Sequence, residues 1–168
     1  MRPPLLLSGP PAAGKSTTAM ALARSARTAA MIDVDDVRHF VVAGHAAPWE
    51  GAEGLKQQQL RIENACALAR RFLRAGVEVV LADLVTPTTA PLYRRGLPDL
   101  RMVRLQLPLD EARRRARLRP VSLTDREFDE LHEVEASSKF DVEAVLDAAR
   151  LTFTEQIRAV SALWVPPT

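Results

Sequence analysis

The sequence has a single cysteine and no long apolar segment. Cys66 is the only thiol among 168 residues, which excludes an internal disulfide and a cluster of thiolate metal ligands. No stretch approaches the roughly 18 consecutive apolar residues typical of a transmembrane helix. The first residues lead directly into a short apolar run that suits a strand. We therefore expect no membrane span, no signal peptide and a cytoplasmic protein.

An excess of charge of one sign is also absent. The formal net charge is +2, which is too small by itself to indicate nucleic acid binding. Lysine occurs only at positions 15, 56 and 139, so arginine supplies nearly all of the positive charge. Aromatic residues make up 5% of the chain, and none form a stripe with basic residues as in a track for single-stranded nucleic acid. We therefore expect no nucleic acid partner.

Segments with the apolar pattern of strands alternate along the chain with segments that have the apolar pattern of helices. The length suits one domain over residues 1–168. Strands are predicted at residues 5–7, 29–32, 77–82, 102–107 and 145–146. Helices are predicted at residues 15–27, 36–43, 55–75 and 110–119, from residue 124 onward, and from residue 152 to about residue 164. Residues 44–54 are expected to form a loop. The long helix carries Cys66 on its apolar face together with Ile62, Ala65, Ala69, Phe72 and Leu73. Such alternation predicts an α/β domain around a parallel sheet.

The most specific motif is a phosphate-binding loop. Residues 9–16 read Gly-Pro-Pro-Ala-Ala-Gly-Lys-Ser, which is G-x-x-x-x-G-K-S between a predicted strand and a predicted helix. This order places phosphate at a helix N-terminus. We expect Lys15 to reach the β- and γ-phosphates and Ser16 to ligate Mg²⁺. The residues expected to bind the nucleotide are Gly9, Ala12, Ala13, Gly14, Lys15, Ser16 and Thr17.

Acidic residues follow two further strands. Asp33 and Asp35 end the second strand, and Asp83 follows the apolar run of residues 79–82 in a Walker-B pattern. Asp33 and Asp35 share a face if the strand continues through them. Alternatively, Asp33, Asp35 and Asp36 are N-terminal residues of the next helix, where its dipole favours acids. Beside a γ-phosphate, a carboxylate can accept the acceptor's proton or hold Mg²⁺ through water. We expect the metal site to include Ser16, Asp33 and Asp83, while the division between base and metal carboxylate stays open.

Five arginines lie within seven residues, at positions 113, 114, 115, 117 and 119. They cannot share one face of a helix, so several must be solvated or structural. We expect a lid at about residues 117–135, in which Arg117 and Arg119 neutralise the transferring phosphoryl group. The other three arginines are expected to be structural or to lie on the adenine side.

The acceptor side has weaker signals. Arg38 and His39 follow the aspartates on the predicted short helix, and Trp49 lies in the loop of residues 44–54. We expect these three residues, with Asp35, to face the acceptor. His39, His45 and His132 lack the spacing of zinc ligands.

These features together resemble the P-loop small-molecule kinases, a group that includes shikimate kinase, gluconate kinase and chloramphenicol phosphotransferase. The resemblance rests on residues 9–16, the Asp33-Val34-Asp35 strand end, Asp83, the arginine run, and Leu146-Asp147 before a capped helix. It implies a three-layer αβα domain with a five-stranded parallel sheet and an arginine-bearing lid. It also implies ATP with Mg²⁺ and phosphorylation of a small-molecule hydroxyl, an antibiotic being one candidate.

In this group the second aspartate of the strand end is the proposed base, which corresponds to Asp35, and Asp33 is then a metal or substrate partner. The chain departs from the chloramphenicol enzyme at Leu118, where that enzyme has glycine in its lid. The loop around Trp49 matches no characterised acceptor site.

Two alternatives remain open from the sequence. One is a kinase of nucleosides, nucleotides or nucleic acid 5′ ends, and the other is a non-catalytic nucleotide-binding module. A GTPase is disfavoured because the guanine motifs N-K-x-D and T-K-x-D are absent. Neither the acceptor nor the oligomeric state can be read from these residues.

Overall fold

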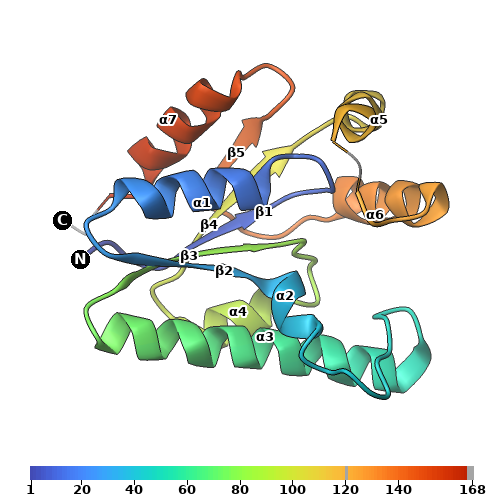
Figure 1. Ribbon diagram of the computed structural model, residues 1–168, viewed down its shortest axis with the longest axis horizontal. Helices are drawn as coiled ribbons and strands as arrows, with labels where there is room; N and C mark the ends of the chain where they lie inside the picture. The colour runs from blue at the N-terminus through green and yellow to red at the C-terminus, as the bar shows by residue number, and fades with distance from the viewer. Residues whose placement is uncertain (120, 166–168) are drawn as a thin grey trace.

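The computed structural model describes residues 1–119 and 121–165, in which strands and helices alternate (Figure 1). The strands are β1 (Leu5–Ser8), β2 (Ala29–Asp33), β3 (Glu78–Asp83), β4 (Arg101–Gln106) and β5 (Ala144–Asp147). The helices are α1 (Lys15–Ser25), α2 (Val34–Arg38), α3 (Gly51–Arg74), α4 (Ala90–Gly96), α5 (Leu109–Leu118), α6 (Asp125–Ser137) and α7 (Phe153–Leu163). Residue 120, inside the expected lid, and residues 166–168 lie outside the described part.

The strands form one sheet in the order β2-β3-β1-β4-β5, and every neighbouring pair is parallel. Helices α1 and α7 cover one face of this sheet and α3 and α4 cover the other (Figure 1). The predicted α/β fold, with three layers and a five-stranded parallel sheet, is therefore confirmed. The strand order changes direction around β1, and in such sheets ligands bind beyond the carboxyl ends of the strands at that point.

The core lies on both faces of the sheet because the central strands are apolar on both sides. In β1, Leu5 and Leu7 join the core beneath α1 and α7, whereas Leu6 joins the core beneath α3 and α4. Val80 and Leu81 of β3 divide in the same way. Successive residues of a strand point to opposite faces, so a continuous apolar run predicts a strand covered on both sides.

The end of β2 differs from the expectation. The strand was predicted over residues 29–32, with both aspartates on one face if it continued through them, before a helix over residues 36–43. The strand instead ends at Asp33, whose side chain accepts a hydrogen bond from the backbone of Asp35 and caps α2 (Val34–Arg38). Val34 is fully buried. A strand can end directly at an acid that caps a helix. Asp35 therefore lies in a helix, and the alternation of side chains along a strand does not place it on the same face as Asp33.

Helix α3 begins at Gly51, four residues before the expected start, and the loop is correspondingly shorter. The chain before the helix lies directly on it, since a Cβ on Gly54 would come within 1.9 Å of the Ala47 carbonyl oxygen. Gln57 holds the same loop by donating to the Gly44 carbonyl and accepting from the Ala46 amide.

On the apolar face of α3, Cys66 is buried as expected, but Phe72, expected on the same face, is 39% exposed. Within the described residues no helix is both long and apolar enough to cross a membrane.

Helix α4 had no counterpart in the sequence prediction. It follows the end of β3 and buries Tyr93 completely. A signal was present: Thr89 precedes the helix and Pro91 lies in its first turn, a position where proline is favoured.

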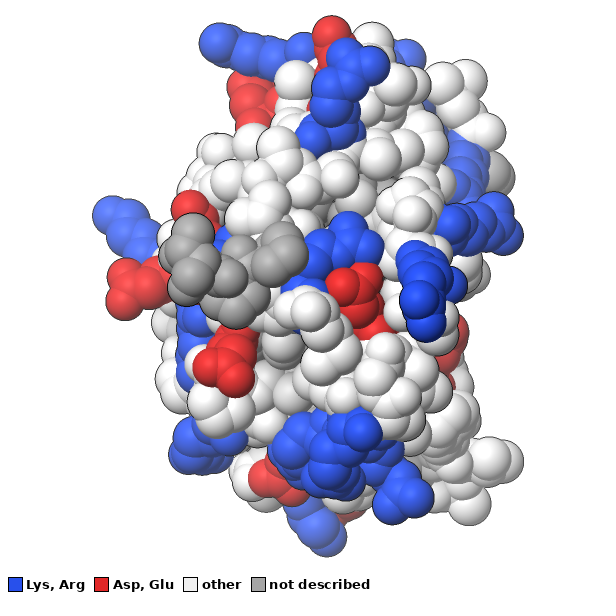
Figure 2. Space-filling model, turned by 90° about the vertical axis from the view of Figure 1, so that its left-hand side faces the viewer, with Lys and Arg blue, Asp and Glu red and all other residues white. Residues whose placement is uncertain are grey.

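The face that carries the N-terminus has basic side chains at its lower end, over the C-terminal part of α3 (Figure 2). Arg70, Arg71 and Arg74 are exposed there. Positive side chains in the last turn of a helix are favoured by its dipole. This cluster therefore has a structural explanation and lies at the far end of α3 from Gly51.

The two predicted capping boxes are both present, at Thr124 before α6 and at Thr152 before α7. Thr152 Oγ1 accepts from the Glu155 amide at 3.2 Å, and the Glu155 carboxylate accepts from the Thr152 amide at 2.8 Å. We predict that Thr152→Ala lowers the free energy of unfolding by about 1 kcal/mol, measured by chemical denaturation. The exposed Thr154, two residues later in the first turn, is the control: Thr154→Ala should change stability by less than half as much. Equal losses in the two variants would contradict a role for the cap.

Candidate functional site

The loop expected to bind phosphate joins β1 to α1, and its backbone is left-handed at two residues. Ala12 and Gly14 have left-handed φ angles of +64° and +82°. Gly9 lies so close to β4 that a Cβ there would come within 2.4 Å of the Leu105 carbonyl oxygen. A non-glycine residue such as Ala12 in the left-handed region is uncommon and is found most often where function needs it. The loop thus presents the N-terminus of α1 at the carboxyl edge of the sheet.

Side chains from three helices hold the carbonyl groups of the loop. Lys15 Nζ donates to the Pro10 carbonyl at 2.9 Å, and His132 Nε2 of α6 donates to the Pro11 carbonyl at 3.0 Å. Gln156 of α7, which is buried, donates to the Ala13 carbonyl at 3.2 Å and to Thr18 Oγ1 at 2.8 Å. The Ala13 amide donates to the Pro10 carbonyl at 3.3 Å, while the amides in the first turn of α1 are donors that a helix leaves for a ligand.

The surroundings of Lys15 lower the pKa of its ammonium group. Burial lowers its pKa, and Asp35, Asp83 and Asp33 offset this only in part. A cation that has lost solvent is stabilised by an added anion more than an exposed cation is. Phosphate oxygens at the N-terminus of α1 would supply that charge.

Ser16 and the end of β2 meet at the loop. Ser16 Oγ donates to Asp33 Oδ2 at 2.6 Å, while Asp33 Oδ1 accepts from the Asp35 amide at 3.1 Å. The structure therefore brings together two of the three residues expected to hold Mg²⁺. A hydroxyl and a carboxylate oxygen side by side are donors that Mg²⁺ prefers.

Asp83, the third expected metal residue, has other partners. It lies opposite Ser8 in the register of β3 with β1, and its carboxylate accepts from Tyr93 Oη at 2.6 Å and from Arg61 Nη2 at 3.3 Å. Burial raises the pKa of Asp83, and the positive charge of Arg61 opposes that rise. Its position matches the Walker-B expectation, but its hydrogen bonds lead away from Ser16.

Arg61 belongs to the candidate site, although the sequence analysis did not single it out. It belongs to α3, is 7% exposed, and donates to Asp35 Oδ1 at 2.9 Å as well as to Asp83. Burial tends to lower its pKa, but Asp83, Tyr93 and Asp35 together raise it above the ordinary arginine value. The signal was an arginine beside Ile62 on the apolar face of the long helix, where an unpaired charge would be costly.

One lid arginine reaches the loop. Arg119 Nη1 donates to Thr17 Oγ1 at 3.0 Å, which links the end of α5 to the first turn of α1. Arg117 is exposed and lines a groove of about 450 Å³ between α5 and α6, with Val121 and Phe128 among its other walls.

The other three arginines of α5 form ion pairs within the fold. Arg113 pairs with Asp129 of α6, and Arg114 and Arg115 pair with Glu111. These contacts agree with a structural role. Within the expected lid of residues 117–135, α6 is anchored by His132 on the loop, and movement of this segment stays a prediction.

The expected acceptor residues lie around α2 without converging on Asp35. His39 is exposed and its ring stacks on that of His45, with centroids 6.4 Å apart. Trp49 is 57% exposed. Arg38 Nε is buried without a hydrogen-bond partner among the described residues. An unpaired buried donor is the kind of group that a ligand can satisfy.

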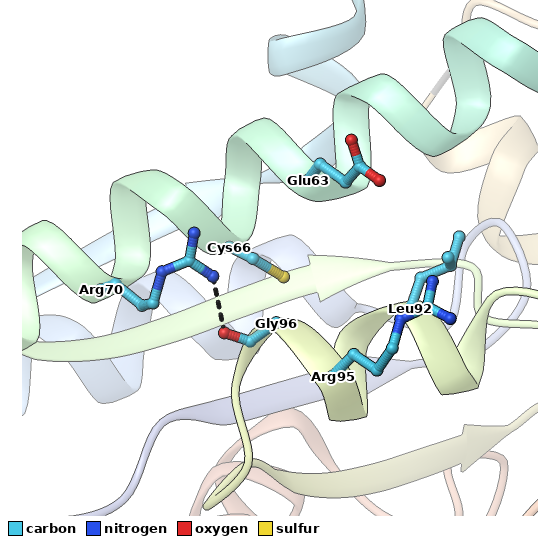
Figure 3. Close-up of a pocket in the computed structure, with 6 residues that line it drawn as sticks. All are labelled: Glu63, Cys66, Arg70, Leu92, Arg95 and Gly96. Carbon is cyan, nitrogen blue, oxygen red and sulfur yellow. Dashed lines mark hydrogen bonds between the residues drawn. The ribbon is translucent and has the colours of Figure 1, made fainter.

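A separate groove of about 170 Å³ lies between α3 and α4, and it includes the thiol (Figure 3). Cys66 faces Gly96 across the groove, and Arg70 of α3 donates to the Gly96 carbonyl at 2.8 Å. Burial raises the pKa of Cys66 to about 11. A thiol with this pKa is protonated at neutral pH and is not a nucleophile, which agrees with the expected structural role.

No protein-family model matches the sequence. No curated protein matches it in sequence either. Solved structures match over nearly the whole chain. A sugar kinase from Janibacter sp. HTCC2649 has 15% identity and a TM-score of 0.75, covering 98% of this chain and 94% of its own. The APS kinase of Mycobacterium tuberculosis, in complex with AMPPNP and APS, has 19% identity and a TM-score of 0.74, covering 96% of each chain. The tunicamycin resistance protein of Deinococcus radiodurans has 16% identity and a TM-score of 0.69, covering 99% and 98%.

The chain has the fold of the P-loop kinases of small molecules. Shikimate kinases and a gluconokinase, which belong to the group that the motifs resemble, are also among the matches. At identities of 15 to 19% the likeness is one of fold. The residue roles must therefore be argued from the site itself.

We predict that Cys66 reacts slowly with iodoacetamide in the folded protein. A pKa of about 11, against an ordinary value of 9.0, lowers the thiolate fraction at pH 8 about 100-fold. Labelling followed by mass spectrometry should thus be at least about 100-fold slower in the native protein than in urea, and should accelerate as pH rises toward 11. Comparable rates in the two states would show that the thiol is neither buried nor perturbed.

Proposed function

We propose that this chain is an ATP- and Mg²⁺-dependent kinase that transfers the γ-phosphoryl group of ATP to a hydroxyl of a small molecule. One observation carries the proposal. Ser16, the last residue of the phosphate-binding motif, donates to Asp33, and Asp35 follows two residues later with a 63% exposed side chain. A phosphate site, a site suited to Mg²⁺ and a solvent-facing carboxylate therefore lie next to each other.

The phosphate side has the conformation and charge that a triphosphate requires. The residues that would hold ATP are Gly9, Ala12, Ala13, Gly14, Lys15, Ser16 and Thr17. Their fit is supported by the left-handed backbone at Ala12 and Gly14 and by the desolvated Lys15. Ser16 and Asp33 would hold Mg²⁺, whereas Asp83, the third residue expected there, is engaged by Tyr93 and Arg61. Mg²⁺ held there would supply positive charge that offsets the negative charge developing during transfer.

Asp35 is the proposed base. Its carboxylate would accept the acceptor's hydroxyl proton as the hydroxyl oxygen bonds to the γ-phosphorus and ADP leaves. Arg119, already at Thr17, and Arg117 would close toward the transferring group and stabilise its charge. Lys15 completes the positive surroundings of the phosphates.

The acceptor would lie between α2 and the start of α3, against Asp35, Arg38, His39 and Trp49. The unpartnered Arg38 Nε supports this placement, because it is a donor for an oxygen of the acceptor. The likeness to a tunicamycin resistance protein and to an APS kinase supports the inclusion of antibiotics and nucleotides among candidate acceptors.

Two measurements test the proposal in order. A thermal shift with Mg-ATP tests nucleotide binding, since a ligand that binds the folded state raises Tm by mass action. A coupled ADP-release screen over aminoglycosides, amphenicols, nucleosides, nucleotides and sugars then tests transfer and finds the acceptor. No Tm shift at millimolar Mg-ATP would overturn the proposal.

We predict that Lys15→Ala abolishes ADP release and the Tm shift by Mg-ATP while the protein still folds. The side chain is desolvated without contributing to the apolar core, so its loss should leave Tm in the absence of ligand nearly unchanged. Lys139→Ala, at an exposed lysine outside the site, is the matched control and should behave as wild type. Turnover that survives Lys15→Ala would exclude the phosphate-binding assignment.

We predict that Asp35→Asn lowers kcat about 10²- to 10⁴-fold, the usual contribution of a general base, and changes the Kd for Mg-ATP less than about threefold. The neighbouring exposed Asp36 gives the control, and Asp36→Asn should retain activity. The measurements are steady-state ADP release and a nucleotide titration. An unchanged kcat in Asp35→Asn would move the base to Asp33 or Asp83.

A further inference from the structure

A chain of buried polar side chains leads from α4 to Asp35. Tyr93 Oη donates to Asp83 Oδ2 at 2.6 Å, and Arg61 Nη2 donates to the same carboxylate at 3.3 to 3.4 Å. Arg61 Nη1 then donates to Asp35 Oδ1 at 2.9 Å. Three consecutive elements, α3, β3 and α4, thus contribute to a chain of contacts that ends on the side chain that we propose as the base.

Burying these three polar side chains costs solvation free energy, which a surface ion pair largely retains. Tyr93, Asp83 and Arg61 are 0%, 4% and 7% exposed. Buried charges lose more solvation than they regain unless their geometry and hydrogen bonds are good, and apolar residues of similar volume often give equal or greater stability. Stability alone therefore does not explain an aspartate, an arginine and a tyrosine at these three positions.

The geometry limits the freedom of Asp35. Its side chain is 63% exposed and, without Arg61, could rotate into solvent. The guanidinium group is planar and binds carboxylates with fixed directions, so Asp83 at one Nη sets the direction in which the other Nη meets Asp35. Asp35 Oδ1 is engaged by that contact, and Oδ2 is left for the acceptor hydroxyl.

We propose that Tyr93, Asp83 and Arg61 are positioning residues that hold the Asp35 carboxylate in its reactive orientation. Asp83 then acts through Arg61 and not as a carboxylate of the Mg²⁺ site, and Tyr93 acts by holding Asp83. This inference rests on the proposed kinase function, because the orientation of Asp35 matters only if it meets an acceptor.

The experiment uses three conservative variants of the full chain: Tyr93→Phe, Asp83→Asn and Arg61→Lys. Arg104→Lys is the matched control, since Arg104 of β4 is about as buried as Arg61 and pairs with the carboxylate of Glu135 in α6. For each protein kcat and KM are measured with the acceptor found by the screen, or with water if none is found. Tm, the Kd for Mg-ATP and the Mg²⁺ dependence are measured alongside.

We expect kcat to fall about 5- to 10-fold in Tyr93→Phe, the effect of one lost hydrogen bond, and about 10- to 100-fold in Asp83→Asn and Arg61→Lys. The Kd for Mg-ATP and the Mg²⁺ dependence should stay within about threefold of wild type. Arg104→Lys should lower Tm without lowering kcat. If the three variants lower Tm but not kcat, then Tyr93, Asp83 and Arg61 have only a structural role.

A second readout does not depend on turnover. In ¹⁵N-labelled protein the Arg61 guanidinium, assigned from the Arg61→Lys spectrum, should show separate Nη resonances because its rotation is restricted. These resonances should merge in Asp83→Asn and broaden in Tyr93→Phe. Unchanged resonances in both variants would overturn the positioning chain, even if no acceptor is known.

The outcomes separate this inference from the proposed function. If Lys15→Ala retains turnover, the kinase assignment fails whatever the three variants do. If Lys15→Ala is inactive but Asp83→Asn raises the Mg²⁺ requirement and Tyr93→Phe is unaffected, Asp83 belongs to the metal site and the positioning role is wrong.

Discussion

The parallel pairing of β1 with β3 and β4 is the constraint on which the rest of the site depends. Because Leu5, Leu6 and Leu7 are buried on both faces, β1 can only occupy the middle of the sheet. Its carboxyl end then lies beside that of β3, with Ser8 opposite Asp83. The loop that leaves β1 must turn at this edge, and Gly9 permits the turn against the Leu105 carbonyl.

The three aspartates at this edge are not interchangeable, although they are the same residue type within a small volume. Asp33 is committed to Ser16 and to the cap of α2. Asp83 is enclosed by Arg61 and Tyr93. Asp35 alone combines one fixed oxygen with a largely exposed side chain. On the proposed function, these environments would divide metal binding, support and proton transfer among the three acids, a pattern that is found in sites where similar acids play different roles.

Much of the fold could be predicted from the sequence because its signals are local. The apolar run before the motif of residues 9–16 predicts a buried strand, and the threonines at positions 124 and 152 predict helix starts that the structure confirms. The β2–α2 junction could not be predicted from alternation, since the cap at Asp33 depends on the burial of Val34. The start of α3 depends on the packing of Ala47 against Gly54, a contact that periodicity does not contain.

The part of the candidate site that lies in one sequence motif could be predicted. The part where side chains from several elements meet could not. The roles expected of Lys15 and Ser16 follow from the spacing of the loop. Arg61 is 26 residues from Asp35 and 22 from Asp83, and no local pattern joins them. The sequence shows only an arginine beside apolar residues on one face of a helix. Its carboxylate partners can be identified only when the positions of the strand ends are known.

The contact of Gln156 with Ala13 and Thr18 has a consequence for the order of folding. The phosphate-binding loop is synthesised among the first residues, but one of the groups that shape it arrives with α7, after every other described strand and helix. On the ribosome, a nascent chain that ends before α7 can form most of the sheet and still lack a finished loop. If the loop binds nucleotide as proposed, binding would become possible only when α7 has been added, so incomplete chains would not bind ATP.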